Sequence, residues 1–300
     1  MNYTVHQLQV FLSVVNEKSV TRASEALFMT QPAVSIQLKN FQEQFEIPLY
    51  EIIGRQLYIT DFGEEIAEIA RRVIDELDNI NYKTQAFKGM VTGKLTISSA
   101  STGKYVIPYF LSGFISSHPG IDLALDVTNK TKVVKSLKQN ETDFAFVSVP
   151  PDNFDIEEEL LIDNKLYLIG NEPRRQKQKA LIYREEGSAT RLSMEKYFGT
   201  EKAKERKKIE LTSNEAVKQA VLAGLGNSVM PLIGIRNEIL NGQLHILPAK
   251  GLPIVTKWRL IWLRGKRLSP AAQAFLEYIR ANRNDLLKKH FEWYLNYGKM

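Results

Sequence analysis

The sequence contains no cysteine, which excludes disulfide bonds and metal sites built on thiolates. It also lacks an apolar run near the roughly 20 residues that a membrane span needs. Residues 1–7 do not show the basic and then apolar plan of a secretory signal. We therefore expect a cytoplasmic protein with no membrane partner.

Catalytic motifs are equally scarce. None of the four histidines has a metal-binding or catalytic spacing such as H-E-x-x-H, because they are spread over the chain at His6, His118, His245 and His290. The sequence has neither a G-x-S-x-G elbow nor a G-x-G-x-x-G loop. We therefore expect no enzyme and no cofactor.

Charge gives little guidance to function. The net charge of +6 and the pI of about 9.2 are typical of a nucleic-acid-binding protein. Residues 1–60, however, hold four basic and five acidic residues, so the positive excess lies in the rest of the chain. With 300 residues, 44% of them apolar, the chain is long enough for two or three domains with cores of their own.

Three short helices and a wing are predicted near the N-terminus. Apolar residues recur at helical spacing over 5–15. A second helix over 19–28 has Ser19 or Thr21 as its N-cap. A third helix follows, and a short strand at 57–60 after a turn has the character of a wing. Short helices joined by tight connections predict an N-terminal all-α winged helix-turn-helix domain.

The third helix is the candidate recognition helix. Gln31 is its expected N-cap and Pro32 its first helical residue, where a missing N–H costs nothing. Val34 and Leu38 mark its buried face, and the opposite face begins with small and polar residues that allow close approach to a major groove. A plain structural helix with a solvated face remains the alternative. The predicted DNA contacts are Thr30, Gln31, Pro32, Ala33, Ser35, Ile36 (toward a thymine methyl), Gln37, Lys39 and, on the wing, Arg55.

From residue 61 to about 89 the pattern is helical again. Residues at steps of three or four, almost all apolar, form a seam like that of a coiled coil: Ile66, Ile69, Val73, Leu77, Ile80, Thr84 and Phe87. We expect a long linker helix that forms a dimer through this seam. The alternative is one long helix that lies on its own domain. Gly89 and Gly93 then mark a hinge.

Beyond the hinge, strands alternate with helices, which predicts an α/β fold with mainly parallel sheets. Pro150 and Pro151 mark a crossover to a second subdomain, and the aromatic tail 291–297 is expected to pack on the domain. The expected strands are 94–99, 121–127, 143–149, 166–169, 180–183, 208–212, 227–230, 243–247 and 258–263. The expected helices are 104–118, 131–139, 190–198, 214–224 and 270–289.

A hydroxyl-rich segment, residues 98–103, follows the first of these strands and opens a helix. Hydroxyls and free amides at a helix N-terminus make a good anion site, although similar caps occur in many helices that bind nothing. The pair Gly103-Lys104 is not a Walker loop, because no glycine precedes it at the required spacing. The segment therefore predicts a small-ligand site.

Several blocks of the chain match one family. They are Leu8-x-x-Phe11, Ser19-Val-Thr-Arg-Ala-Ser-Glu-Ala-Leu27, Thr30-Gln-Pro-Ala-Val-Ser35-x-Gln37-Leu38, Pro48-Leu49-Tyr50, Gly54-Arg55, Leu57-x-Ile59-Thr60-x-x-Gly63, Asn140-Glu-Thr-Asp143 and Val221-x-Ala-Gly-Leu-Gly-Asn-Ser-Val-Met-Pro231. Over essentially its whole length the chain resembles the LysR-type transcriptional regulators, and within them it is weakly similar to regulators of carbon-fixation operons.

The chain also departs from the family pattern. The apolar Ile36 and Ile52, and the neutral Asn40, stand where relatives often carry basic or long polar residues, and Ser24 replaces a common alanine. Fewer cationic contacts predict weaker non-specific DNA binding and a shallower salt dependence.

The resemblance implies a complete architecture. Residues 1–60 would be the DNA-binding domain, 61–89 the linker and dimerisation helix, and 90–300 an effector-binding domain. That domain would hold two Rossmann-like α/β subdomains of the type 2 periplasmic-binding-protein fold, I at about 90–163 and 266–300 and II at about 164–265. The ligand would lie between them. The matching positions hold Ser101, Thr102, Lys130, Ser148, Ser188, Thr190, Arg191 and Ser213.

The cations Lys130 and Arg191 opposite hydroxyls suggest an anionic metabolite, a carboxylate or a phosphate, although each cation can equally form a surface salt bridge. The expected function is a DNA-binding transcriptional regulator whose operator binding or activation responds to that metabolite, acting as a dimer and, by the resemblance, a tetramer. Two alternatives remain: an architectural DNA-binding protein without an effector, and a cytoplasmic solute-binding protein.

Overall fold

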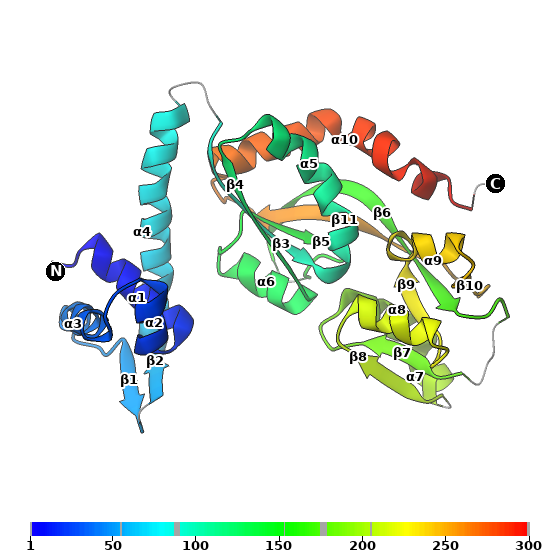
Figure 1. Ribbon diagram of the computed structural model, residues 1–300, viewed down its shortest axis with the longest axis horizontal. Helices are drawn as coiled ribbons and strands as arrows, with labels where there is room; N and C mark the ends of the chain where they lie inside the picture. Colours follow the sequence, from blue (N-terminus) through cyan, green and yellow to red (C-terminus); the bar gives the residue numbers. More distant parts are fainter. Residues whose placement is uncertain are drawn as a thin grey trace. The chain divides into compact units, whose positions relative to one another are not determined.

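The computed structural model describes residues 2–54, 56–86, 91–152, 154–174, 179–204 and 206–298. The chain separates into two compact units, Met1–Gly89 and Met90–Met300 (Figure 1). The first unit has one hydrophobic core and the second has three clusters of buried residues. Each unit therefore buries apolar surface independently of the other.

The first unit begins with the helices α1 (Val5–Glu17), α2 (Val20–Ala26) and α3 (Gln31–Gln42). Thr4 caps α1 in a capping box, in which the backbone N–H of Gln7 donates to the Thr4 hydroxyl over 3.2 Å. Ser19, not Thr21, caps α2, because its hydroxyl accepts from the N–H of Arg22 over 3.3 Å. Both side chains give an acceptor to a backbone donor that the helix leaves without one.

The third helix begins one residue earlier than predicted. Gln31 is already helical and Thr30 is the N-cap, with extended backbone angles of φ −77° and ψ 146°, so the prediction of Gln31 as the cap is wrong. Pro32 lies in the first turn, where no N–H is needed. The predicted inward face is confirmed, because Val34 and Leu38 are buried in the core of the unit.

The wing is an antiparallel hairpin of β1 (Tyr50–Ile53) and β2 (Gln56–Ile59). The sequence predicts only the second strand, because three of the four residues of β1 are exposed and the strand shows no alternation. Just beyond the hairpin, a Cβ on Gly63 would lie 2.0 Å from the carbonyl oxygen of Leu49. Only glycine fits where the chain passes from the hairpin into the next helix.

That helix is α4 (Asp61–Ala86), and its apolar seam divides in two. Ala67 and Ala70 are buried in the core of the first unit, and Ile66 packs beside them. Ile69 and Val73, in contrast, are 48% and 40% exposed. Part of the seam thus covers the unit's own core and part faces outward. Residues 87–89 of the predicted helix, Phe87 of the seam among them, lie outside the described residues.

The second unit is built on a mixed seven-stranded sheet in the order β10-β6-β11-β5-β3-β4, with β9 also paired to β6. β3 pairs in parallel with β4 and β5, and a separate sheet pairs β7 in parallel with β8. β6 and β11 are antiparallel to each other and to their other partners, so the prediction of mainly parallel sheets is wrong for this part. The strands are β3 (Gly93–Ala100), β4 (Ile121–Thr128), β5 (Phe144–Val147), β6 (Ile156–Gly170), β7 (Leu181–Arg184), β8 (Lys208–Leu211), β9 (Ser228–Pro231), β10 (His245–Ile246) and β11 (Ile254–Leu263).

Helices pack around these strands in two lobes, which confirms the predicted pair of α/β subdomains. Lobe I is the part around β3, β4, β5, α5, α6 and α10, and lobe II is the part around β7, β8, β9, α7 and α8. β6 contributes Leu161 to the core of lobe I and Leu168 to that of lobe II, and Figure 1 shows β6 and β11 running between the lobes. The helices are η1 (Ser101–Tyr105), α5 (Ile107–Ser117), α6 (Lys130–Lys138), α7 (Ala189–Lys204, broken at Gly199), α8 (Asn214–Leu222), η2 (Leu232–Gly234), α9 (Arg236–Leu240) and α10 (Pro270–Asn296).

The aromatic tail packs on the domain, as predicted, as the last turns of α10. Phe291 and Tyr294 are buried. The Tyr294 hydroxyl accepts from the backbone N–H of Lys165 over 2.7 Å and donates to the carbonyl of Asp163 over 2.9 Å. Both partners lie on β6 between its lobe I and lobe II segments, so the tail holds this strand where it passes from one lobe to the other.

Candidate DNA-binding face and ligand-binding junction

The outward face of α3 is accessible. Gln31, Pro32 and Lys39 are exposed, and Ile36 is 58% exposed. An isoleucine this exposed gains little from the fold and is accessible to an external contact. The remaining predicted residues of the face are also at or near the surface: Thr30 is exposed, and Ala33, Ser35 and Gln37 are half-buried.

Two polar contacts shape the same face. The Gln31 side-chain amide donates to the Ser35 hydroxyl over 3.1 Å, which holds both groups on the first turns of α3. Lys39 lies 3.8 Å from Glu43, one helical turn further on. This exposed pair offsets part of the positive charge of the face. The contact predicted for Arg55 lies outside the described residues.

In the second unit, three side chains from separate elements meet where the lobes join. Ser101 opens η1 in lobe I, Arg184 ends β7 in lobe II and Asn214 opens α8. The Ser101 hydroxyl accepts from Arg184 Nη2 over 3.1 Å and from the Asn214 amide over 3.4 Å. We call these residues the lobe junction. It brings together the carboxyl ends of two strands and a helix N-terminus, which is a common place for ligands in α/β proteins.

Arg184 is the residue of the junction that sequence reasoning missed. Its side chain is 3% exposed and forms a two-pronged pair with Glu185, Nε to Oε2 over 2.7 Å and Nη2 to Oε1 over 2.8 Å. Its remaining nitrogen, Nη1, is buried and has no hydrogen-bond partner among the described residues. A buried donor without an acceptor is costly, and a guanidinium prefers anionic oxygens. The group is therefore suited to hold an anion.

Other predicted ligand residues lie near the same joint between the lobes. Thr102 and Ser148 are buried at the ends of their lobe I elements. In lobe II, Ser188 and Thr190 are buried in the turn that opens α7. This turn is close to lobe I, because a Cβ on Gly187 (φ +79°) would lie 2.3 Å from the hydroxyl oxygen of a threonine in α6. The turn that opens α7 therefore lies against α6 of lobe I.

Lys130, the first residue of α6, is half-buried and its amine donates to the carbonyl of Pro150 over 3.4 Å. Burial lowers its pKa from the usual value, and the nearby carboxylate of Asp152 partly opposes that shift. A partly dehydrated ammonium gains more from an incoming anion than a solvated one does. Lys130 therefore keeps its predicted role as a candidate cation for the ligand.

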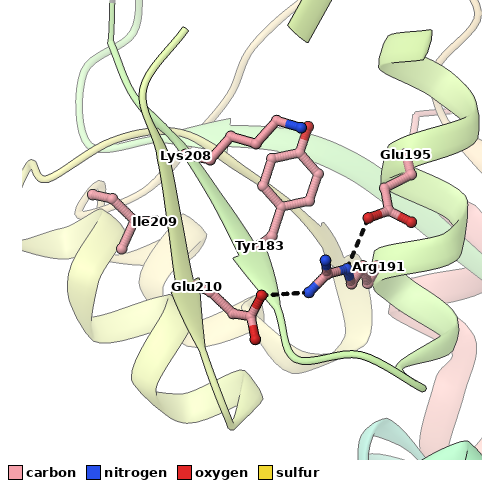
Figure 2. Close-up of a pocket in the computed structure, with 6 residues that line it drawn as sticks. All are labelled: Tyr183, Arg191, Glu195, Lys208, Ile209 and Glu210. Atoms are coloured by element: carbon pink, nitrogen blue, oxygen red, sulfur yellow. Dashed lines mark hydrogen bonds and ion pairs between the residues drawn. The ribbon is translucent and has the colours of Figure 1, made fainter. Parts of the chain in front are cut away.

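Arg191 and Ser213 are engaged elsewhere. Arg191 donates to Glu195 over 2.8 Å, to Glu210, and to the carbonyl of Arg184 over 3.1 Å. Figure 2 shows it between these two carboxylates, in a pocket of about 270 Å³ lined by Tyr183, Arg191, Glu195, Lys208, Ile209 and Glu210. The exposed Ser213 caps α8, where its hydroxyl accepts from the N–H of Ala216 over 3.0 Å. Arg191 thus meets the lobe junction through the backbone carbonyl of Arg184, while the Ser213 hydroxyl is used in the cap of α8.

Across the described part of the chain, no helix is long and apolar enough to cross a membrane. Over the same ranges, no group of three or more His, Cys, Asp or Glu side chains is placed to hold a metal ion.

Two family models match the chain in tandem. Residues 5–64 match the bacterial regulatory helix-turn-helix protein of the LysR family, and residues 88–284 match the LysR substrate-binding domain. The chain belongs to the LysR family of transcriptional regulators. Relatives in this family bind operator DNA through the first domain, and the second is their effector-binding domain.

Individual LysR relatives cover nearly the whole chain. The HTH-type transcriptional activator CmpR of Synechocystis sp. is 35% identical over 94% of this chain and 96% of its own length. A RuBisCO operon transcriptional regulator of Allochromatium vinosum is 37% identical over 93% of this chain and 96% of its own. The similarity to regulators of carbon-fixation operons, which the sequence predicts, is therefore confirmed.

Solved structures agree with the two-unit LysR architecture. The Synechocystis CcmR regulatory domain in complex with 2-PG is 34% identical, covers 65% of this chain and 99% of its own, and has a TM-score of 0.59. The crystal structure of CbnR, a LysR family transcriptional regulator, is 19% identical over 93% of this chain and 99% of its own, has a TM-score of 0.66 and supports the fold alone.

Proposed function

We propose that this LysR-type regulator is controlled by a small phosphate or carboxylate anion bound at the lobe junction, with Arg184 as its anchor. The observation that carries the proposal is the buried Arg184 Nη1, which lacks an acceptor among the described residues, on a guanidinium whose Nη2 donates to the Ser101 hydroxyl. The CcmR regulatory domain, a relative at 34% identity, binds 2-PG (2-phosphoglycolate), a small anion of this kind. The other residues of the proposed site are Thr102, Lys130, Ser148, Ser188 and Thr190. Arg191 and Ser213 have a structural role instead, because they bond to Glu195 and Glu210 and to the N–H of Ala216.

The test is isothermal titration of the full chain with inorganic phosphate and with 2-phosphoglycolate. Removing Arg184 alone would leave the largely buried Glu185 carboxylate without its partner, so the variant carries Arg184→Met together with Glu185→Gln. It should lose binding of both anions, whereas Glu185→Gln alone should bind both more tightly than the wild type does. Arg191→Met is the matched control and should bind as the wild type does. Equal affinities for the double variant and the wild type would refute the assignment.

For the first unit, we propose DNA contact through the exposed face of α3, from Thr30, Gln31, Pro32, Ala33, Ser35, Ile36, Gln37 and Lys39, with Arg55 on the wing. A gel shift with the duplex upstream of the protein's own gene tests it. No sequence-specific shift at low salt would favour the solute-binding alternative. We also propose that the protein works in the cytoplasm and performs no catalysis.

We further propose that residues 61–89 join two copies of the chain, with the tetramer implied by the family as the larger assembly. The supporting observation is that Ile69 and Val73 remain 48% and 40% exposed on α4, beside alanines that already cover the unit's own core. Val73→Glu should place a charge in such an interface and lower the mass measured by light scattering. Ile36→Glu, on the DNA face, is the control that should leave the mass unchanged.

A further inference from the structure

The helix α2 ends in a backbone motif whose left-handed position is usually occupied by glycine. The N–H of Phe28 donates to the carbonyl of Glu25 over 3.2 Å, and that of Met29 donates to the carbonyl of Ser24 over 2.9 Å. These two bonds close the end of α2 in a Schellman motif. The residue between them, Phe28, has φ +53°, in the left-handed region that side chains with a Cβ disfavour.

Burial does not compensate for this conformation. The Phe28 side chain is 99% exposed, more than any other large apolar residue among those described. Two other non-glycine residues of the described ranges have a positive φ, Lys18 and Asn140, and both are polar. A glycine or an asparagine at position 28 would satisfy the turn at least as well. Neither the backbone nor the core of the first unit explains a phenylalanine here, which points to a contact outside the chain.

The position of Phe28 in the chain indicates what it contacts. It lies three residues before Gln31, the first residue of α3, so their Cα atoms are at most about 11 Å apart. A helix with its side chains is about 10–12 Å wide and the major groove is about 12 Å wide, so a helix in the groove lies against both sugar–phosphate walls. A duplex that receives the N-terminal end of α3 therefore has a wall within reach of position 28.

We propose that Phe28 is a further DNA-contacting residue, whose ring packs on the deoxyribose of the strand that borders the N-terminal end of α3. The inference rests on the proposed DNA contact through α3. Residues 1–60 hold fewer basic than acidic residues, so this domain has few cations with which to release counterions. An apolar contact with a deoxyribose adds affinity without releasing counterions, and it adds the same affinity whatever the base sequence of the DNA.

The test compares Phe28→Gly with the wild-type full chain. Because glycine accepts the positive φ, the variant should melt about 2–4 °C higher than the wild type. It should nevertheless bind DNA about three- to tenfold more weakly, the loss expected from half-burying a phenyl ring. The loss should be equal on the duplex upstream of its own gene and on sheared genomic DNA, with the same slope of affinity against salt. A variant that is more stable but binds DNA more weakly has lost a DNA contact, because a structural defect would lower its stability as well.

Matched variants complete the design. Phe28→Asn also tolerates the left-handed conformation and should weaken binding like glycine, whereas Phe28→Tyr keeps the ring and should bind like the wild type. If both Phe28→Gly and Phe28→Asn bind DNA as tightly as the wild type, the proposal is overturned. Loss of transcription at unchanged DNA affinity would also overturn it, because the ring would then contact a protein. A wild type that binds no DNA at all would instead refute DNA contact through α3.

Discussion

The two-pronged pair between Arg184 and Glu185 predicts that removal of the Glu185 charge will raise the affinity for phosphate. Glu185→Gln removes the carboxylate charge and keeps the shape. Glu185 Oε1 lies 2.8 Å from Arg184 Nη2, so an anion oxygen bound to Nη1 on the far side of the guanidinium would lie about 6 Å from it. At an effective dielectric constant near 20, two unit charges at this distance repel by about 3 kcal/mol. We therefore expect the variant to bind inorganic phosphate about ten- to a hundredfold more tightly.

Stability should change in the opposite direction. Glutamine keeps at most one of the two charge-assisted hydrogen bonds, so the variant should lose about 1–2 kcal/mol of unfolding free energy. Titration calorimetry gives the affinity and urea denaturation gives the stability. Glu195→Gln is the control, since Glu195 pairs with Arg191 over 2.8 Å in the pocket of Figure 2 and should not alter phosphate binding. Phosphate affinity that stays constant or falls in a folded Glu185→Gln would refute Arg184 as the anchor.

Two further predictions concern the second unit. Tyr294→Phe removes the hydroxyl that bonds to the N–H of Lys165 and the carbonyl of Asp163. We expect a loss of about 2–4 kcal/mol of unfolding free energy, which lowers the melting temperature of this unit by about 5–10 °C. An unchanged transition in calorimetry would contradict this prediction. Burial lowers the pKa of Lys130 below its usual 10.5, so phosphate affinity should fall as pH rises through that lowered value. In the same window the fold should gain stability with pH, because the unfolded chain holds the proton longer. Lys130→Arg should abolish the fall in affinity, and a parallel fall in variant and wild type would exclude Lys130.

The helix-turn-helix could be predicted because its signals are local. Helical spacing gives the buried face of α3, and the proline in its first turn gives its start to within one residue. The error at the cap arises because Thr30 and Gln31 are both polar, so only the backbone angles distinguish them. Phe28 could not be singled out, since a phenylalanine between helices is expected to be buried and its 99% exposure is visible only in the fold.

In the second unit, pairing between distant residues explains why the sequence predicts one strand incompletely. The sequence predicts only 166–169 as strand, but β6 is fifteen residues long, Ile156–Gly170. Its first half carries the acidic run 157–159, which has the composition of a loop. In the fold, Glu158 pairs with Arg259 over 2.6 Å and Glu159 with Arg280 over 2.7 Å. Partners about a hundred residues away make these charges compatible with a strand, and no local pattern reports them.

The proposed ligand site also combines residues that a local pattern predicts with one that it does not. The hydroxyls at Ser101 and Thr102 could be predicted, because they follow a strand and open a helix. The sequence predicts Arg191 as the cation and gives no reason to choose Arg184, which lies seven residues earlier. Burial at the end of β7 and a hydrogen bond to Ser101 distinguish Arg184, whereas Arg191 is occupied by two carboxylates. Both distinctions depend on residues from other elements.

The lobe junction also limits how strongly a ligand can act. Ser101 belongs to lobe I and Arg184 to lobe II, so an anion that contacts both binds the arrangement in which the lobes are close more tightly than one in which they are apart. At a concentration one hundred times its dissociation constant, such a ligand stabilises the close arrangement by at most about 2.7 kcal/mol. The bonds from Arg184 and Asn214 to Ser101 already favour that arrangement without a ligand. Weakening them by Asn214→Ala should therefore lower the unliganded population of the close state and increase the change that phosphate produces.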